Sequence, residues 1–175
     1  MKTKNEVILV DERDNEIGVL EKIEAHRLGK LHRAFSIFVF NSKGELLIQK
    51  RALAKYHSGG LWSNTCCSHP RPGEQLEVTA RKRLKEEMGI ECDLREIHKF
   101  IYNTEFGNGL VEYEYDHVLV GRSDDMPVVN SEEAEDWRWV DTRFLVADMK
   151  DNPDSYTYWF RISLDDVLAV VTLGN

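Results

Sequence analysis

Strict alternation of residue types runs from Glu112 to Val120, and it restricts the fold more than any other pattern in this chain. Successive side chains of a β-strand point to opposite faces, so Glu112, Glu114 and Asp116 would share one face. Three carboxylates in a row repel one another unless a cation or a buried proton compensates them. We therefore predict a strand whose acidic face binds metal, in preference to a face that is merely solvated.

Other apolar runs predict further strands at 7–10, 17–20, 34–40, 45–51, 92–102 and 134–140. Two of these strands flank a turn signal at 41–44, which is typical of a β-hairpin. Two tryptophans in the last strand are candidates for the hydrophobic core.

Helices are predicted at 21–28, at 142–149 and in a C-terminal stretch that begins after a chain break at 152–154. Gly29 would end the first of them, and Asp141 would cap the second. The strongest helical pattern lies between Glu74 and Gly89. Its apolar stripe repeats every fourth residue and consists of Leu76, Ala80, Leu84 and Met88.

Composition and charge narrow the class of protein. A chain of 175 residues, 42% of them hydrophobic, is large enough for one packed core, and we expect residues 1–175 to form a single domain. The net charge of −8 without a basic block argues against a nucleic-acid partner. No apolar run reaches membrane-spanning length, which argues against a membrane partner. Three cysteines without a disulfide framework fit a reducing, cytoplasmic setting.

Two adjacent cysteines followed by a histidine form a second informative stretch. As an extended segment it would place Thr65, Cys67 and His69 on one face, and Cys66 and Ser68 on the other. Cys67 and His69 can then enter one pocket, where a thiol beside an imidazole, or beside a metal that it holds, suits proton transfer or nucleophilic attack. A buried strand with inert cysteines is the competing interpretation.

Several other residues have both a structural and a functional interpretation. Arg51 and Lys55 belong to a cationic cluster that is either a solvated strand end or an anion clamp. On the predicted helix, Arg83 and Glu87 are spaced to be neighbours. Glu86 and Glu87 together, considered alone, indicate a solvated pair. The aromatic run at 156–160 exceeds the needs of one packing face and can line a pocket.

His26 and His32 lie on either side of Gly29. They converge only if the chain turns between them, which a glycine permits. Each histidine considered alone indicates a surface residue.

With these residues in view, the chain resembles the Nudix superfamily. The superfamily pattern is matched at Glu74, Leu84, Glu86, Glu87, Gly89 and Ile90. It is not matched at Ser68, Lys82 and Arg83, where the superfamily has Gly, Arg and Glu. Arg83 thus replaces a carboxylate that Nudix hydrolases use as a metal ligand. This departure favours an isomerase of the superfamily over a hydrolase.

A more specific resemblance, over about residues 20–159, is to the type 1 isopentenyl diphosphate isomerases. It rests on a cysteine motif (NTCCSHP, 64–70), a histidine motif (LHRAFS, 31–36) and a glutamate motif (EYE, 112–114). One departure is Tyr158, where family members often carry proline. The resemblance implies an α/β (α+β) fold, with a Nudix-type mixed β-sheet sandwiched between helices.

The reaction implied by this resemblance converts isopentenyl diphosphate into dimethylallyl diphosphate through a tertiary carbocation. Cys67 would transfer a proton on one face of the alkene, and Glu114, assisted by Tyr102, on the other. Cationic side chains would neutralise the diphosphate and an indole ring would face the carbocation. These substrate-binding residues are Lys22, Arg51, Lys55, Arg83 and Trp159.

The resemblance also implies two metal ions. Glu87 would hold Mg²⁺ together with the substrate diphosphate. A Zn²⁺ or Mn²⁺ ion would be bound by imidazoles and carboxylates, a donor set that suits either metal. These ligands are His26, His32, His69, Glu112 and Glu114.

The expected partner is a small isoprenoid diphosphate, and the expected state is a monomer or weak dimer. Two other functions remain open. One is a Nudix hydrolase that acts on a nucleoside or other organic diphosphate. The other is a binding module without turnover, which is disfavoured because Cys67, His69, Tyr102, Glu112 and Glu114 are all present.

Overall fold

A nine-stranded mixed β-sheet forms the centre of the protein, and the computed structural model describes residues 5–173. Its strands are β1 (Glu6–Val10), β2 (Glu16–Glu21), β3 (His32–Phe40), β4 (Leu46–Arg51), β5 (Trp62–Ser63), β6 (Cys66–Ser68), β7 (Leu94–Glu105), β8 (Val111–Arg122) and β9 (Ala134–Val140). The helices are α1 (Lys22–Arg27), α2 (Leu76–Met88), α3 (Thr142–Asp151), the short 3₁₀ helix η1 (Pro153–Ser155) and α4 (Tyr158–Leu173). Every predicted strand and helix is present.

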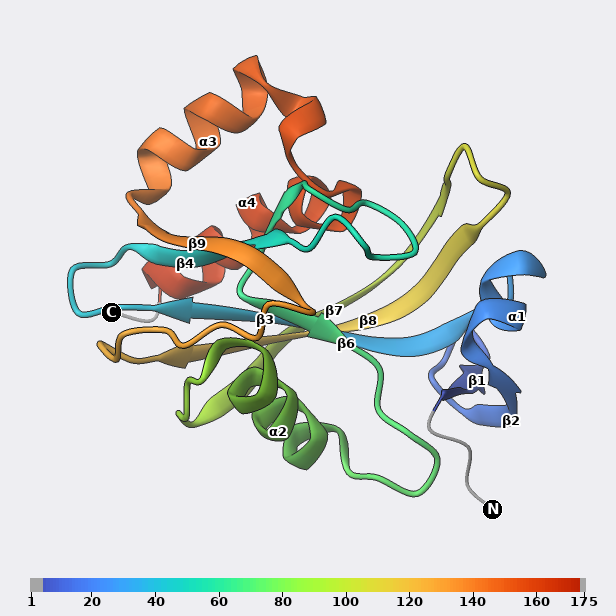
Figure 1. Cartoon of the computed structure of the whole chain (residues 1–175). Helices are drawn as coiled ribbons and strands as arrows, with labels where there is room; N and C mark the ends of the chain where they lie inside the picture. Colours follow the sequence, from blue (N-terminus) through green and yellow to red (C-terminus); the bar gives the residue numbers. More distant parts are fainter. Residues whose placement is uncertain (1–4, 174–175) are drawn as a thin grey trace.

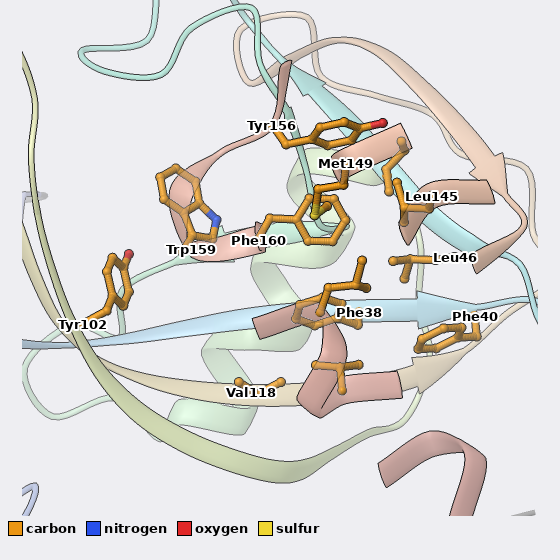
Figure 2. Packing of buried hydrophobic residues seen from close by; sticks show 13 residues of the cluster. Phe38, Phe40, Leu46, Tyr102, Val118, Leu145, Met149, Tyr156, Trp159 and Phe160 are labelled. Atoms are coloured by element: carbon orange, nitrogen blue, oxygen red, sulfur yellow. The ribbon is translucent and has the colours of Figure 1, made fainter. Parts of the chain in front are cut away.

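Helices cover both faces of the sheet, as the fold prediction required (Figure 1). On one face α2 packs its predicted stripe against inward-pointing sheet residues such as Ile37 and Val39. On the other face α3 and α4 pack against Phe38 and Phe40. Figure 2 shows this second core, with Tyr102 and Trp159 at one end of it. Side chains of successive β3 residues thus alternate between two cores, as strand geometry demands.

Strand β3 determines which residues meet in the site, because it pairs with β1, β4, β6 and β8. Its parallel pairing with β8 places His32 opposite Glu114, and its antiparallel pairing with β6 places Ser36 opposite Cys67. The β7–β8 pairing adds Tyr102 beside Glu114. Residues that are far apart in the sequence therefore become neighbours through strand register alone.

The predicted hairpin at 41–44 is only partly right. The turn forms, with the Asn41 N–H donating to the Glu45 carbonyl oxygen, but within residues 5–173 β3 and β4 pair only at Phe40 and Leu46. Beyond that point β4 pairs with β5 and β9. The strands diverge because the segment of β5 and β6 lies between them, with β5 on β4 and β6 on β3.

Local signals define the helix ends. Gly89 ends α2 in the left-handed conformation at φ 69°, which suits glycine, and its N–H donates to the Lys85 carbonyl oxygen. Asp141 caps α3 by accepting from the N–H groups of Arg143 and Phe144. Among the helices of residues 5–173, none is both long and apolar enough to cross a membrane.

Candidate active site

A cavity of about 250 Å³ lies where β6, β7, β8, the start of α4 and the loop after β4 meet. Most of the predicted site residues line it: Lys22, Arg51, Lys55, Cys67, His69, Arg83, Glu87, Tyr102, Glu112, Glu114 and Trp159. His26 and His32 are fully buried behind this lining. The cavity thus brings together groups from both ends of the chain.

Two of the predicted metal ligands are oriented by main-chain oxygens. The chain turns at Gly29 with φ 57°, and the rings of His26 and His32 approach to 4.8 Å between centroids. Nδ1 of His26 lies 2.6 Å from the Lys22 carbonyl oxygen, and Nδ1 of His32 lies 2.8 Å from that of Lys30. A carbonyl only accepts, so each Nδ1 carries a proton, and in the neutral ring each Nε2 presents a lone pair.

The ligand atoms of His26, His32, His69 and Glu114 lie within 4.8 Å of one another. The Glu114 Oε1 atom is 2.8 Å from His69 Nε2 and 3.5 Å from His32 Nε2. Among the described residues, Nε2 of His26 and of His32 has no hydrogen-bond partner. Buried, unpartnered nitrogen lone pairs facing a carboxylate are what a bound cation requires. This set therefore fits a metal.

Glu112 belongs to a different group. Its ligand atoms cluster with those of His26 and His57, again within 4.8 Å, rather than with His69 and Glu114. His57 was not predicted as a site residue. Its loop has no periodic pattern, so the only available signal was a histidine between the cationic cluster and the cysteine stretch.

Burial and neighbouring charges together set the protonation of the site. Although burial acts against it, the hydrogen bond and charge of Glu114 raise the pKa of His32. Burial lowers the pKa of His26 to about 4 and the pKa of His57 and of His69 to about 3. These last three imidazoles are neutral at pH 7, the form that binds metal.

The pKa values of the two glutamates shift in opposite directions. Burial and the Glu114 charge raise the pKa of Glu112. For Glu114, His69 and His32 outweigh burial and hold the pKa well below its usual range.

Cys67 is held in a network of hydrogen bonds. Its thiol donates to Asn64 Oδ1 at 3.0 Å and accepts from the indole Nε1 of Trp159 at 3.1 Å, with Ser36 Oγ at 3.7 Å. Burial raises the pKa of Cys67 to about 12, so the group is a thiol at neutral pH. Cys66 is fully buried in the core that α2 covers. Its side chain therefore points away from that of Cys67, as strand alternation predicts.

Thr65 does not share the cavity with Cys67 and His69, contrary to the face prediction. It precedes β6, and its hydroxyl donates to the Leu47 carbonyl oxygen at 2.6 Å while accepting the Val39 N–H at 2.9 Å. The face prediction therefore describes only Cys66, Cys67 and His69, because Ser68, which was predicted to face away with Cys66, also lines the cavity. Thr65 departs from the prediction because it lies in the gap between β3 and β4 and satisfies main-chain groups there.

On the other face of the cavity, Tyr102 Oη donates to Glu114 Oε2 at 2.6 Å. Glu114 is thus bound on one oxygen by a phenol and on the other by His69. The third carboxylate of the strand face, Asp116, is buried and accepts from Ser36 Oγ at 2.7 Å, and burial raises its pKa well above the usual range. The predicted acidic face is thus entirely buried.

Cationic side chains gather at the α2 end of the cavity. Arg83 contacts Glu87 at 2.6 Å and Glu133 at 3.0 Å, and Lys55 also pairs with Glu133. The expectation of a solvated glutamate pair is wrong for Glu87, which is only 3% exposed. Arg83 and Gln49 bind its two oxygens, and this compensates for the burial.

Some residues near this end differ from the predictions. Glu133 was not predicted, because it lies in a turn that carries no motif. Of the aromatic run, Trp159 lines the cavity, with the Arg51 guanidinium 5.2 Å from its ring centre. Tyr156 and Phe160 instead pack in the core shown in Figure 2, so the predicted aromatic wall is reduced to Trp159.

Comparison with known proteins first identifies the class of protein to which this chain belongs. A family model described as NUDIX domain matches residues 30–161. A Deinococcus radiodurans protein of known structure superimposes with a TM-score of 0.78 at 22% identity, over 93% of this chain and 98% of that one. The MutT protein from Methanosarcina mazei gives 0.64 at 18% identity, over 78% and 91% of the two chains. These structures share the fold.

Proteins with similar sequences then identify the group within this class. Isopentenyl-diphosphate Delta-isomerase 2 from Aromatoleum aromaticum is 52% identical over 98% of this chain and 91% of its own length. Isopentenyl-diphosphate Delta-isomerase 1 from the same organism is 55% identical over 95% and 94%. The Burkholderia multivorans enzyme of this name is 52% identical over 91% and 90%. The chain therefore belongs to the NUDIX domain family and, within it, to the isopentenyl-diphosphate Delta-isomerases.

Proposed function

We propose that this protein is an enzyme that isomerises isopentenyl diphosphate to dimethylallyl diphosphate. The observation that carries the proposal is one cavity lined by a neutral thiol, Cys67, and by a carboxylate bound to a phenol, Glu114 and Tyr102. Moving a double bond by one position requires one proton to be added and another removed. The names of the close relatives support the same reaction.

The substrate carries its negative charge at one end, and two of the cavity's cations, Arg83 and Lys55, lie together at its α2 end. Arg83 and Lys55 are held by Glu133, while Arg51 lies against Trp159. In the proposal these groups and Lys22 bind the diphosphate, and Glu87 binds Mg²⁺ together with it. Anchoring the diphosphate fixes the position of the five-carbon tail, which supplies much of the rate advantage of a bound substrate.

The other end of the cavity would carry the proton chemistry. Cys67 serves one face of the alkene, and Glu114 with Tyr102 serves the other. One group gives a proton to the terminal carbon, which leaves a tertiary carbocation, and the other removes a proton from the carbon next to the CH₂O group. The Trp159 ring would stabilise the cation by about 2 kcal/mol when water is absent. Exclusion of water prevents capture of the cation.

A divalent cation fits the cluster of His26, His32, His69 and Glu114, and we propose that Glu112 also joins it. Zn²⁺ and Mn²⁺ are the candidates. When bound, the cation would supply a fixed positive charge that sets the acidity of Glu114. The protein's own contribution is to hold Glu114 between His69 and Tyr102, in the lining of the cavity that Cys67 also lines.

We further propose that residues 1–175 form one catalytic domain that acts as a monomer or weak dimer in the cytoplasm, on a small isoprenoid diphosphate without nucleic-acid or membrane partners. The single sheet that runs through the described residues supports one domain. Three free cysteines suit a reducing compartment. The net charge of −8 does not favour nucleic acid.

The test is incubation with isopentenyl diphosphate, Mg²⁺ and Mn²⁺ in D₂O, followed by ¹H NMR. The expected result is dimethylallyl diphosphate that contains deuterium, without release of phosphate. A panel of nucleoside and organic diphosphates is run in parallel. Release of phosphate or of a nucleoside monophosphate from that panel, with no allylic product, would show a Nudix hydrolase instead.

A further inference from the structure

His57 is a buried imidazole that the proposed mechanism leaves without a role. It is 6% exposed, stacks on Phe106 with centroids 4.4 Å apart, and packs edge-on against Tyr56. Its Nδ1 lies 3.1 Å from Ser58 Oγ. Among the described residues its Nε2 has no hydrogen-bond partner and lies 3.2 Å from Glu112 Oε1. The ring is therefore fixed, with one nitrogen directed at a carboxylate.

The loop that carries His57 has an unusual backbone. Ser58 adopts φ 52°, in the left-handed region that non-glycine residues rarely use. A side chain on Gly59 would meet the Leu53 carbonyl oxygen at 2.6 Å, so the loop needs glycine there to close tightly. Arg51 Nη2 lies 3.3 Å from the His57 carbonyl oxygen. Strain of this kind persists when the surrounding structure imposes it, and it is frequent at functional sites.

Within each of the two groups the ligand-atom separations suit one coordination sphere. Metal–nitrogen and metal–oxygen bonds of about 2.1 Å place neighbouring donors of an octahedron about 3.0 Å apart. The observed separations are 2.8 Å for His69 and Glu114, 3.5 Å for His32 and Glu114, and 3.2 Å for His57 and Glu112. His26 belongs to both groups, and its single free Nε2 cannot serve two ions at once.

We propose that His57 is a ligand of the same cation as His26, so that one ion is bound by six donors. That both groups share one ion rests on the proposed function, which places Glu112 in the metal site. The two groups, which share His26, together supply four imidazoles and two carboxylates: His26, His32, His57, His69, Glu112 and Glu114. Six donors exceed the four of tetrahedral zinc sites, so the site selects an ion that accepts octahedral coordination.

The experiment uses Co²⁺ as the probe on the full-length protein. Bound Co²⁺ is counted after dialysis, its affinity is measured by competition with a chromophoric chelator, and imidazole ligands are counted by X-ray absorption at the Co edge. His57→Ala and His57→Gln are compared with His98→Ala, which removes a histidine that is half-exposed on β7 and pairs with Asp166. Circular dichroism verifies folding of each variant.

The wild type should bind one equivalent of Co²⁺ with four imidazoles. His57→Ala and His57→Gln should retain one equivalent with three imidazoles and an affinity at least tenfold lower, because even outer ligand partners are worth about 10–100-fold. His98→Ala should match the wild type. Unchanged affinity and imidazole count in His57→Ala would overturn the proposal. Two equivalents in the wild type falling to one would also overturn it, because they indicate separate ions.

These results are independent of isomerase activity. If His57→Ala binds Co²⁺ like the wild type while the wild type forms the allylic product, the sixth ligand is wrong and the proposed function stands. If the affinity and imidazole count fall as expected while the wild type forms no allylic product, the ligand assignment stands and the reaction is wrong.

Discussion

Asn64 shows how one side chain orients two others in the site. Its amide nitrogen donates to the main-chain oxygens of Ile37 and Cys66, both at 3.1 Å. These bonds leave Oδ1 facing the Cys67 thiol and the Trp159 indole. Oδ1 accepts a hydrogen bond from the thiol at 3.0 Å and from the indole N–H at 3.1 Å. The proposed proton-transfer group and the proposed cation-stabilising ring therefore share one anchor, and that anchor is fixed by the main chain.

The two adjacent cysteines should behave differently on substitution. Cys67→Ala removes a cavity-lining thiol and should reduce turnover by about 10²–10⁴-fold, the usual cost of losing a proton-transfer group. Cys66→Ala affects the α2 core and should keep most of the activity, with stability lower by about 1 kcal/mol. Initial rates and thermal unfolding measure both effects. Equal loss of turnover in two folded variants would contradict this assignment.

Glu112 and Glu114 should also differ on substitution, since Glu114 accepts from Tyr102 Oη at 2.6 Å and pairs with His69, whereas Glu112 pairs with His57. A glutamine lacks the charge and carries no exchangeable carboxyl proton, but its amide oxygen remains a weak ligand. Glu112→Gln should lose metal affinity first and recover part of its rate as metal is added. Glu114→Gln should stay inactive in excess metal. Metal content and initial rates over a metal titration distinguish the two roles. Equal recovery of the rate in both variants would show that Glu114 is only a metal ligand.

At the scale of elements, the segment of β5 and β6 replaces the pairing that β3 and β4 do not make. Thr65 links the two strands by bonding to Leu47 and Val39. The cysteine stretch is consequently part of the sheet, rather than a loop laid on top of it. This explains why Cys66 and Cys67 reach opposite cores within one short strand.

Thr65→Val tests this link, because valine has nearly the shape of threonine but cannot form hydrogen bonds. It leaves two buried main-chain groups unpaired, and the free energy of unfolding should fall by about 2 kcal/mol. Thr104→Val on β7, where the side chain is half-buried, serves as the matched substitution. Urea unfolding of the three proteins gives the comparison. Equal losses in both variants would mean that the link carries no special stability.

Glu133 joins α2 to the loop after β4 through Arg83 and Lys55. Although burial acts against it, these partners lower the pKa of Glu133 from 4.5 to about 2. A lowered pKa stabilises the fold above the unfolded value, and the contribution is lost as pH falls through the folded value.

Glu133→Gln should therefore reduce the free energy of unfolding by about 1 kcal/mol at pH 7. The deficit should shrink between pH 4.5 and about pH 2, where the wild-type carboxylate becomes protonated. Denaturant unfolding at several pH values measures it, with Glu132→Gln, an exposed neighbour, as the control. A deficit that does not change over this interval would show that the carboxylate charge is not what stabilises the link.

At the scale of the whole molecule, periodic sequence patterns predicted which side chains share a face of a strand or helix. The acidic face of β8, the apolar stripe of α2 and the opposite orientations of Cys66 and Cys67 all follow from side-chain spacing within one element. The fold class and the family followed from the motifs of the same elements. Strand and helix positions were predictable for the same reason, since each depends on local sequence.

What could not be predicted depends on loops and on long-range pairing. His57 lies in a loop where Ser58 adopts a left-handed conformation, and no periodic pattern in the sequence predicts this conformation. Glu133 reaches Arg83 and Lys55 from a turn. The hairpin prediction failed in part because a turn signal at 41–44 cannot reveal that a third segment will separate its two strands.

The parallel pairing of β3 with β8 also has a consequence for the order of assembly. The partner of His32 is Glu114, so the central strand acquires this neighbour only after more than half of the chain has been synthesised. Contacts between such distant residues form slowly, because a long loop must close first. We therefore expect the half of the cavity that carries the proposed metal ligands to be completed late in folding. A nascent chain that ends before β8 has the cysteine motif but no site for it to serve.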